Sequence, residues 1–151
     1  MPKPQKQSAA IDLSHASLAR SVGTYSLEQA LTNGILVKVT SWVIPEMGFH
    51  PEGFRVHVAV TARLWKTIAT VSPRVVRFQT VRGRGDDVLW LAAYALRIAR
   101  QTGQEAATFD AFLPTPQDSG VEGIKTLRAA WCENDKKRWV TIGYPEEWAS
   151  L

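Results

Sequence analysis

The chain contains 151 residues, of which 45% are hydrophobic and 21% charged. This composition is typical of a globular protein and excludes a disordered one. A chain of this length suits one domain, whose folding buries roughly 70% of the surface of the unfolded chain. The formal net charge is +4, and the positive excess lies in the middle of the sequence, mostly as arginine.

The cysteine count and the hydropathy of the sequence exclude further classes of protein. The single cysteine, Cys132, excludes an internal disulfide and a metal cluster built on cysteines. A lone cysteine suits a reducing compartment, so we expect the protein in the cytoplasm. No run of about 18 apolar residues occurs, and no apolar segment follows the polar N-terminus. We therefore expect no membrane contact and no signal peptide.

The N-terminal part divides into an arm and the start of a domain. Residues 1–23 are polar and rich in serine, and we expect a flexible arm followed by a single domain over residues 24–151. Ser26 and Gln29 have the spacing of a capping box, which predicts a short helix that ends at Asn33-Gly34. The apolar, β-branched run over residues 35–40 then predicts a strand.

A second strand and a second helix follow. Residues 54–60 alternate between apolar and polar or small side chains, as expected for a half-buried strand. Thr61 is a suitable N-cap for a helix that carries Leu64 and Ile68 on its buried side. Ser72-Pro73 marks the point by which this helix must end.

The strongest signal is the run from Asp86 to Gly103. Apolar residues surround the helical axis here, which predicts a buried helix, with Trp90 among its core residues. Asp86 or Asp87 is expected to cap its N-terminus, and Gly103 can adopt the left-handed conformation that ends it. The run is too short to span a bilayer, so we interpret it as the central core helix of a soluble domain.

The C-terminal third is predicted to be strands. Residues 109–113 form a short candidate strand, and the alternating runs 127–132 and 139–144, joined by a polar turn, predict a β-hairpin. The element order predicts an α+β fold. In it, the central helix and two or three further helices pack on an antiparallel sheet that ends in the hairpin.

No catalytic, cofactor or metal signature is present. The histidines stand in three separate contexts and form no metal-ligand pair; they are His15, His50 and His57. Cys132 lies in a predicted strand, where a structural thiol is the usual case, and no glycine-rich phosphate-binding motif occurs. We therefore expect a protein that is not an enzyme and that holds no cofactor or metal.

The basic middle segment is the candidate binding site. Four arginines lie within eleven residues, with Phe78 among them; they are Arg74, Arg77, Arg82 and Arg84. The last two belong to an Arg-Gly stretch that we expect to form a flexible loop. Arginine recognises carboxylates and phosphates through its planar fork. We expect these four residues to bind an acidic protein surface or a nucleic-acid backbone. In the alternative, Arg77 and Arg82 pair internally with acidic residues such as Asp86 and only hold the loop in place.

Several short motifs also agree in order and spacing with a known protein family. They are Tyr25-Ser26, Gln29-Ala30-Leu31, Gly34, Leu36-Val37, Val39-Thr40, Gly48-Phe49, Val58-Ala59-Val60-Thr61, Trp65 and Asp87-Val88-Leu89-Trp90-Leu91. In these motifs the chain resembles an uncharacterised family of small proteins encoded on bacterial plasmids, phages and integrative elements. The resemblance covers about residues 25–95 and transfers no site residue.

What the resemblance implies is a biological context. The expected function is a non-catalytic accessory protein of a mobile element in a bacterial host cell. It would bind a macromolecular partner, for instance as an inhibitor of a host defence complex of the anti-CRISPR or anti-restriction kind. The alternative is a nucleic-acid-binding accessory protein that uses the segment from Arg74 to Arg84.

Overall fold

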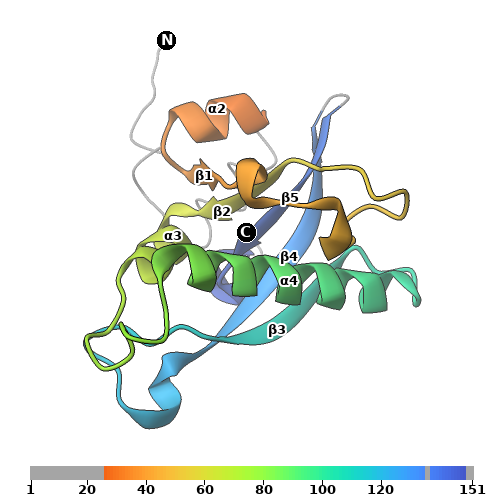
Figure 1. The fold of residues 1–151 in the computed structure, drawn as a ribbon. Helices are drawn as coiled ribbons and strands as arrows, with labels where there is room; N and C mark the ends of the chain where they lie inside the picture. The colour runs from red at the N-terminus through yellow and green to blue at the C-terminus, as the bar shows by residue number, and fades with distance from the viewer. Residues whose placement is uncertain (1–25, 135–136, 149–151) are drawn as a thin grey trace.

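A single mixed sheet with helices on both faces forms the α+β domain (Figure 1). The computed structural model describes residues 26–134 and 137–148; the expected arm, residues 1–23, lies outside them. Three α-helices occur in the described part: α2 (Leu27–Thr32), α3 (Ala62–Ala69) and α4 (Val81–Arg100). The strands are β1 (Leu36–Lys38), β2 (Val58–Thr61), β3 (Ala106–Phe112), β4 (Ile124–Asn134) and β5 (Lys137–Gly143).

The spatial order of the strands is β1-β2-β5-β4-β3, so β1 and β3 are the edges. Neighbouring strands are antiparallel except for β2 and β5, which run parallel with Val58 opposite Val140. The predicted hairpin is confirmed as β4 and β5. Hairpin alternation cannot reveal the parallel pair, because β2 and β5 are far apart in the sequence, and the sheet is therefore mixed.

The sheet separates two apolar clusters. The larger one lies between the sheet and the helices α3 and α4, and the smaller one lies under α2 and the 3₁₀ turn η6 (Pro145–Trp148) on the other face. Trp139 in β5 is the largest fully buried side chain and belongs to the smaller cluster. Alternation along β5 sends Trp139 to one face and Val140 to the other, so one strand supplies both cores.

The predicted helix starts are confirmed for α2 and α3. The Ser26 Oγ accepts a hydrogen bond from Gln29 N at 3.2 Å, and Gln29 Oε1 accepts one from Ser26 N at 2.9 Å, which completes the capping box. Thr61 Oγ1 accepts from Leu64 N at 3.1 Å and caps α3. The two strands between these helices are shorter than expected: β1 has three residues and β2 has four.

The predicted start of the central helix was wrong. Helix α4 begins at Val81, and its N-cap is Thr80, whose hydroxyl accepts from Gly83 N at 2.9 Å. The stretch expected to be a flexible basic loop is thus the first turn of the helix. Gly85 serves close packing here, because a Cβ at this position would overlap the ring of Trp42. The end was placed well, since Gly103 adopts φ +76° just after the helix.

The expectation that α4 is buried all round was also wrong. Val88, Leu89, Ala92, Ala93 and Leu96 are buried against the sheet, but Trp90 is 44% exposed and Tyr94 57% exposed. Leu91 and Ile98 are exposed on the same side of the helix. Helix α4 therefore covers one face of the sheet and leaves an apolar stripe on its own outer face.

Candidate partner-binding surface

Arg84, one of the four expected binding residues, lies in the interior of the protein. Its side chain is fully buried at 0% exposure, so it cannot contact a partner, and its assignment as a binding residue is corrected. Helix α4 begins at Val81, five residues earlier than the sequence indicated, so Arg84 belongs to the helix. The helix directs the Arg84 side chain to the C-terminal end of α3.

All three nitrogen atoms of the Arg84 guanidinium donate to oxygen atoms. Nε donates to Ile68 O at 3.0 Å, and one terminal nitrogen donates to Thr67 O at 2.7 Å. The other terminal nitrogen donates to Pro114 O at 3.0 Å and to Gln79 Oε1 at 2.7 Å. Burial lowers the pKa of this guanidinium from its usual value. The charge is stabilised by the carbonyl groups that end α3, where the helix dipole is negative.

Arg82 also has an internal role. Its Nε lies 3.1 Å from Asp86 Oδ1, and its guanidinium lies over the Trp42 ring, 4.9 Å from the ring centroid. This is the internal pairing that the sequence left open for Arg82. Asp86 therefore does not cap the helix but forms an ion pair one turn inside it.

Arg74 and Arg77 remain on the surface, in the turn between α3 and α4. Arg74 donates to the backbone oxygen of Asp118 at 3.0 Å, which joins this turn to the loop between β3 and β4. Gln79 Nε2 makes a second link, to Phe112 O at 3.0 Å. The two loops therefore form one end of the molecule, at the lower left of Figure 1.

This end carries exposed apolar side chains, and we call it the tip surface. Phe78 is 83% exposed and Val121 is 81% exposed. Val76, Phe112 and Ile124 are exposed to between half and three-fifths, and Arg74 and Arg77 are also exposed. The tip surface consists of Arg74, Val76, Arg77, Phe78, Phe112, Val121 and Ile124. A hollow of about 170 Å³ between the two loops is lined by Arg74, Val75 and Phe112 among others. Sequence reasoning found the arginines and Phe78 but missed the residues of the second loop.

The carboxylate of Asp118, next to the tip surface, pairs with a lysine and not with the arginines of that surface. Lys125 Nζ lies 2.6 Å from Asp118 Oδ2, and this contact, with hydrogen bonds from Thr115, lowers the pKa of Asp118 to about 2. Within the described residues, Arg74 and Arg77 form no ion pair. Their positive charges are therefore available to a partner.

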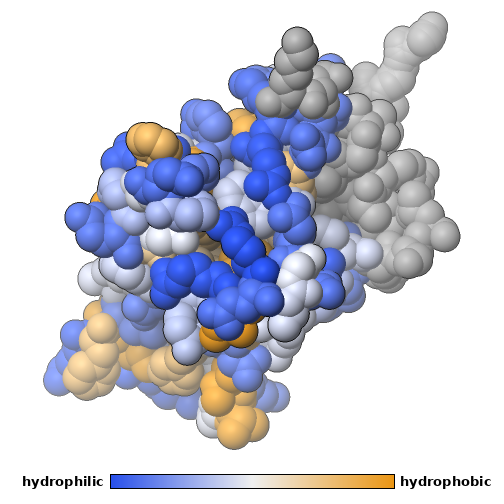
Figure 2. Space-filling model, turned by 90° about the vertical axis from the view of Figure 1, so that its right-hand side faces the viewer, coloured by the Kyte–Doolittle hydropathy of each residue, from blue (hydrophilic) through white to orange (hydrophobic). Residues whose placement is uncertain are grey.

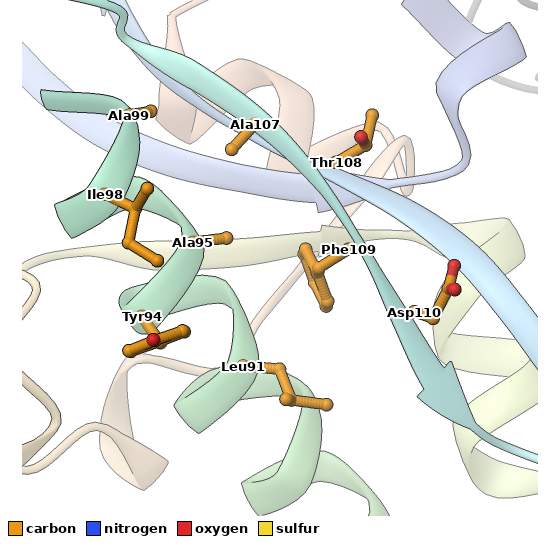
Figure 3. Close-up of a pocket in the computed structure, with 9 residues that line it drawn as sticks. All are labelled: Leu91, Tyr94, Ala95, Ile98, Ala99, Ala107, Thr108, Phe109 and Asp110. Carbon is orange, nitrogen blue, oxygen red and sulfur yellow. The ribbon is translucent and has the colours of Figure 1, made fainter. Parts of the chain in front are cut away.

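A second apolar surface lies between α4 and the edge strand β3. Figure 3 shows Leu91, Tyr94 and Ile98 of α4 beside Phe109 of β3, around a groove of about 360 Å³. Figure 2 shows that hydrophobic side chains gather at the lower end of the molecule. The sequence signal for this groove is that apolar residues surround most of helix α4, more than can pack against one face of the sheet.

The buried titratable groups outside these surfaces have structural partners. Glu147 Oε2 accepts from Thr61 Oγ1 and from Tyr144 N, each at 2.9 Å, and burial raises the pKa of this carboxyl. Burial likewise raises the pKa of the Cys132 thiol. Among the described residues, no three side chains of the metal-ligand types come together, and no helix has the length and apolar character to cross a membrane.

The chain matches no protein-family model, no curated protein and no solved structure.

Proposed function

We propose that this chain is a non-catalytic binding protein whose partner is an acidic protein surface, held by the tip surface. The observation that carries the proposal is the side chain of Phe78, which is 83% exposed and follows the exposed Arg77 directly. An aromatic ring next to arginine is the usual composition of the few residues that dominate the affinity of a protein interface. Phe78 belongs to a group of exposed apolar side chains on the tip surface, and an exposed apolar patch marks an interaction site.

The rest of the tip surface favours a protein partner over nucleic acid. Val76, Val121 and Ile124 are aliphatic, and aliphatic side chains gain free energy by burial against a protein. A phosphate backbone would instead be bound by many cations, each neutralising a phosphate. Only Arg74 and Arg77 of the four expected arginines offer unpaired charge within the described residues.

The biological setting that we propose comes from the resemblance in sequence. An accessory protein of a plasmid, phage or integrative element acts in a bacterial host cell on machinery of the host. A host defence complex with an acidic binding surface is therefore the proposed partner, and inhibition by occupation of that surface is the proposed mode of action.

A nucleic-acid backbone is the second candidate partner. The specific observation in its favour is again Phe78, because an exposed ring beside arginines can stack on an unpaired base. Binding of this kind weakens steeply with salt and depends on charge more than on aliphatic residues.

Co-purification of the tagged protein from its bacterial host, with and without nuclease, tests the proposal. We expect partner proteins to remain bound after nuclease treatment. The double variant Arg77→Glu with Phe78→Ala should lose them and keep the melting temperature of the wild type, because both side chains are exposed.

A matched control is Arg55→Glu, which changes the charge equally at another exposed arginine outside the tip surface. This variant should retain the partner. Full retention of the partner by the Arg77 and Phe78 variant would contradict the proposal. Loss of all binding after nuclease, together with retention of random single-stranded DNA at low salt, would favour the nucleic-acid candidate.

A further inference from the structure

A hollow with two arginines lies beside the C-terminal half of α4. It is formed by this half of the helix and by the loop that follows the 3₁₀ turn η4 (Pro45–Met47), which lies next to α4 in Figure 1. Its volume is about 680 Å³, within the usual range for sites that bind small molecules. Arg97 and Arg100 line the hollow, and no acidic residue of the described chain lines it.

The guanidinium of Arg97 is held in place at this hollow. Nη1 donates to Met47 O at 2.8 Å, and the guanidinium carbon lies 5.7 Å from the centroid of the Tyr94 ring. The group also lies directly on Gly48, where an added Cβ would overlap Nη1, and Gly48 has φ +82°. Position 48 therefore suits glycine for two reasons. A side chain that is fixed in advance loses less conformational entropy when a ligand binds.

The positive charge at the hollow is not compensated within the described residues. Neither Arg97 nor Arg100 forms an ion pair there, and Glu52 in the neighbouring loop contacts His50 instead. The two arginines are three positions apart on one helix, where like charges repel each other. The dipole at the end of α4 offsets only about half a unit charge. An anion bound between the arginines would remove the repulsion.

Apolar side chains form much of the remaining wall. Tyr94 and Ile98 are exposed on α4, and Pro51 is exposed on the loop. These side chains gain free energy when an apolar ring covers them, whereas a bare inorganic anion would leave them in contact with water. The lining thus combines a fixed charge with an apolar wall, as small-molecule sites usually do, and suits a ligand that has both parts.

We propose that the hollow binds a small organic phosphate, a monophosphate ester of an aromatic or heterocyclic ring. Its phosphate oxygens accept hydrogen bonds from Arg100 and from Nε and Nη2 of Arg97, which have no acceptor among the described residues. Its ring covers Tyr94, Ile98 and Pro51. The phosphate carries a charge of about −2 at neutral pH and matches the two arginines, whereas a carboxylate carries a single charge. The site is separate from the tip surface, which lies at the other end of α4.

Isothermal titration calorimetry with defined probes tests the proposal. Adenosine monophosphate and para-nitrophenyl phosphate have both parts of the ligand. Adenosine, inorganic phosphate and para-nitrobenzoate each lack the charge, the ring or the second charge. We expect at least one of the two phosphate esters to bind at millimolar concentration or below. The three comparison probes should bind about tenfold more weakly or worse, because each loses one set of contacts.

Arg100→Gln is the clearest variant, because Arg100 is exposed. It should keep the melting temperature of the wild type and weaken binding of the ester about tenfold or more. Gly48→Ala should weaken binding as well, since the new Cβ displaces the guanidinium of Arg97. Arg77→Gln on the tip surface is the matched control and should bind the ester as the wild type does.

The structural alternative is that Arg97 only joins the loop of η4 to α4, and it predicts equal affinity for the ester in Arg100→Gln and in the wild type. That result would overturn the proposal. So would failure of both phosphate esters to bind the wild type at millimolar concentration, or a comparison probe that binds as tightly as the esters do. None of these results changes the role of the tip surface, because partner binding there depends on Arg77 and Phe78.

Discussion

Replacement of Arg84 by methionine is the most direct test of the fold described above. The substitution keeps much of the length of the side chain but removes the guanidinium and all of its hydrogen bonds. Two of the acceptors, Ile68 O and Pro114 O, lie in buried hydrogen bonds with Arg84. In Arg84→Met they remain buried without a donor.

The magnitude follows from those two oxygen atoms. A buried acceptor that loses its donor costs about 1–3 kcal/mol. Two of them, with the lost favourable interaction between the cation and the end of α3, give about 3–5 kcal/mol of lost unfolding free energy. For a chain of this size, each kcal/mol shifts the melting temperature by about 2–4 °C, so a decrease of roughly 6–20 °C is expected.

Urea unfolding followed by tryptophan fluorescence measures the loss, and circular dichroism gives the melting temperature. Arg84→Lys keeps the charge but has fewer donors, and should fall between the wild type and Arg84→Met. Arg77→Met is the matched control, since Arg77 is exposed, and should change stability by no more than about 0.5 kcal/mol. Equal stability of Arg84→Met and Arg77→Met would refute the reasoning.

Three further outcomes are expected. Gly85→Ala should cost about 1–3 kcal/mol in urea unfolding, because the new Cβ overlaps the Trp42 ring, and wild-type stability would show that the ring moves freely. Trp139→Ala should cost about 3–5 kcal/mol, whereas Trp90→Ala in dilute solution should cost about 1 kcal/mol or less; similar losses would contradict the burial of Trp139 and the exposure of Trp90. Burial raises the pKa of Glu147, so the folded state holds this proton more tightly than the unfolded chain does. The stability contribution of Glu147 should therefore fall as pH rises from the unfolded pKa through the folded one, and Glu147→Gln should remove that slope.

The parts of the fold that local signals determine were predictable from the sequence. The capping box at Ser26 and the N-cap at Thr61 depend on residues three positions apart, and both helices begin where these signals lie. The hairpin of β4 and β5 depends on alternation interrupted by a polar turn, which is equally local. The end of α4 at Gly103 follows from the backbone freedom of glycine.

The start of α4 depended on a contact that no local pattern contains. Two glycines in the first turn normally argue against a helix, since each lowers helix propensity by about 1 kcal/mol relative to alanine. Gly85 is accommodated because Trp42, more than forty residues earlier, packs against it. Arg84 becomes buried for a related reason, because carbonyl groups from two distant segments converge on it. The candidate site was therefore predicted in part: Arg74 and Arg77 lie on the tip surface, but its second loop required the register of β3 and β4.

The parallel pairing of β2 with β5 has a consequence for synthesis of the protein. Val58 and its neighbour Val140 are 82 positions apart in the sequence. While the ribosome makes the intervening residues, β2 can pair with β1 but has no neighbour on its other side. The sheet can therefore close only after β5 has been made. A nascent chain stalled before β5 would expose the apolar residues of β2 to chaperones and proteases, so synthesis of β5 is the event that completes the sheet.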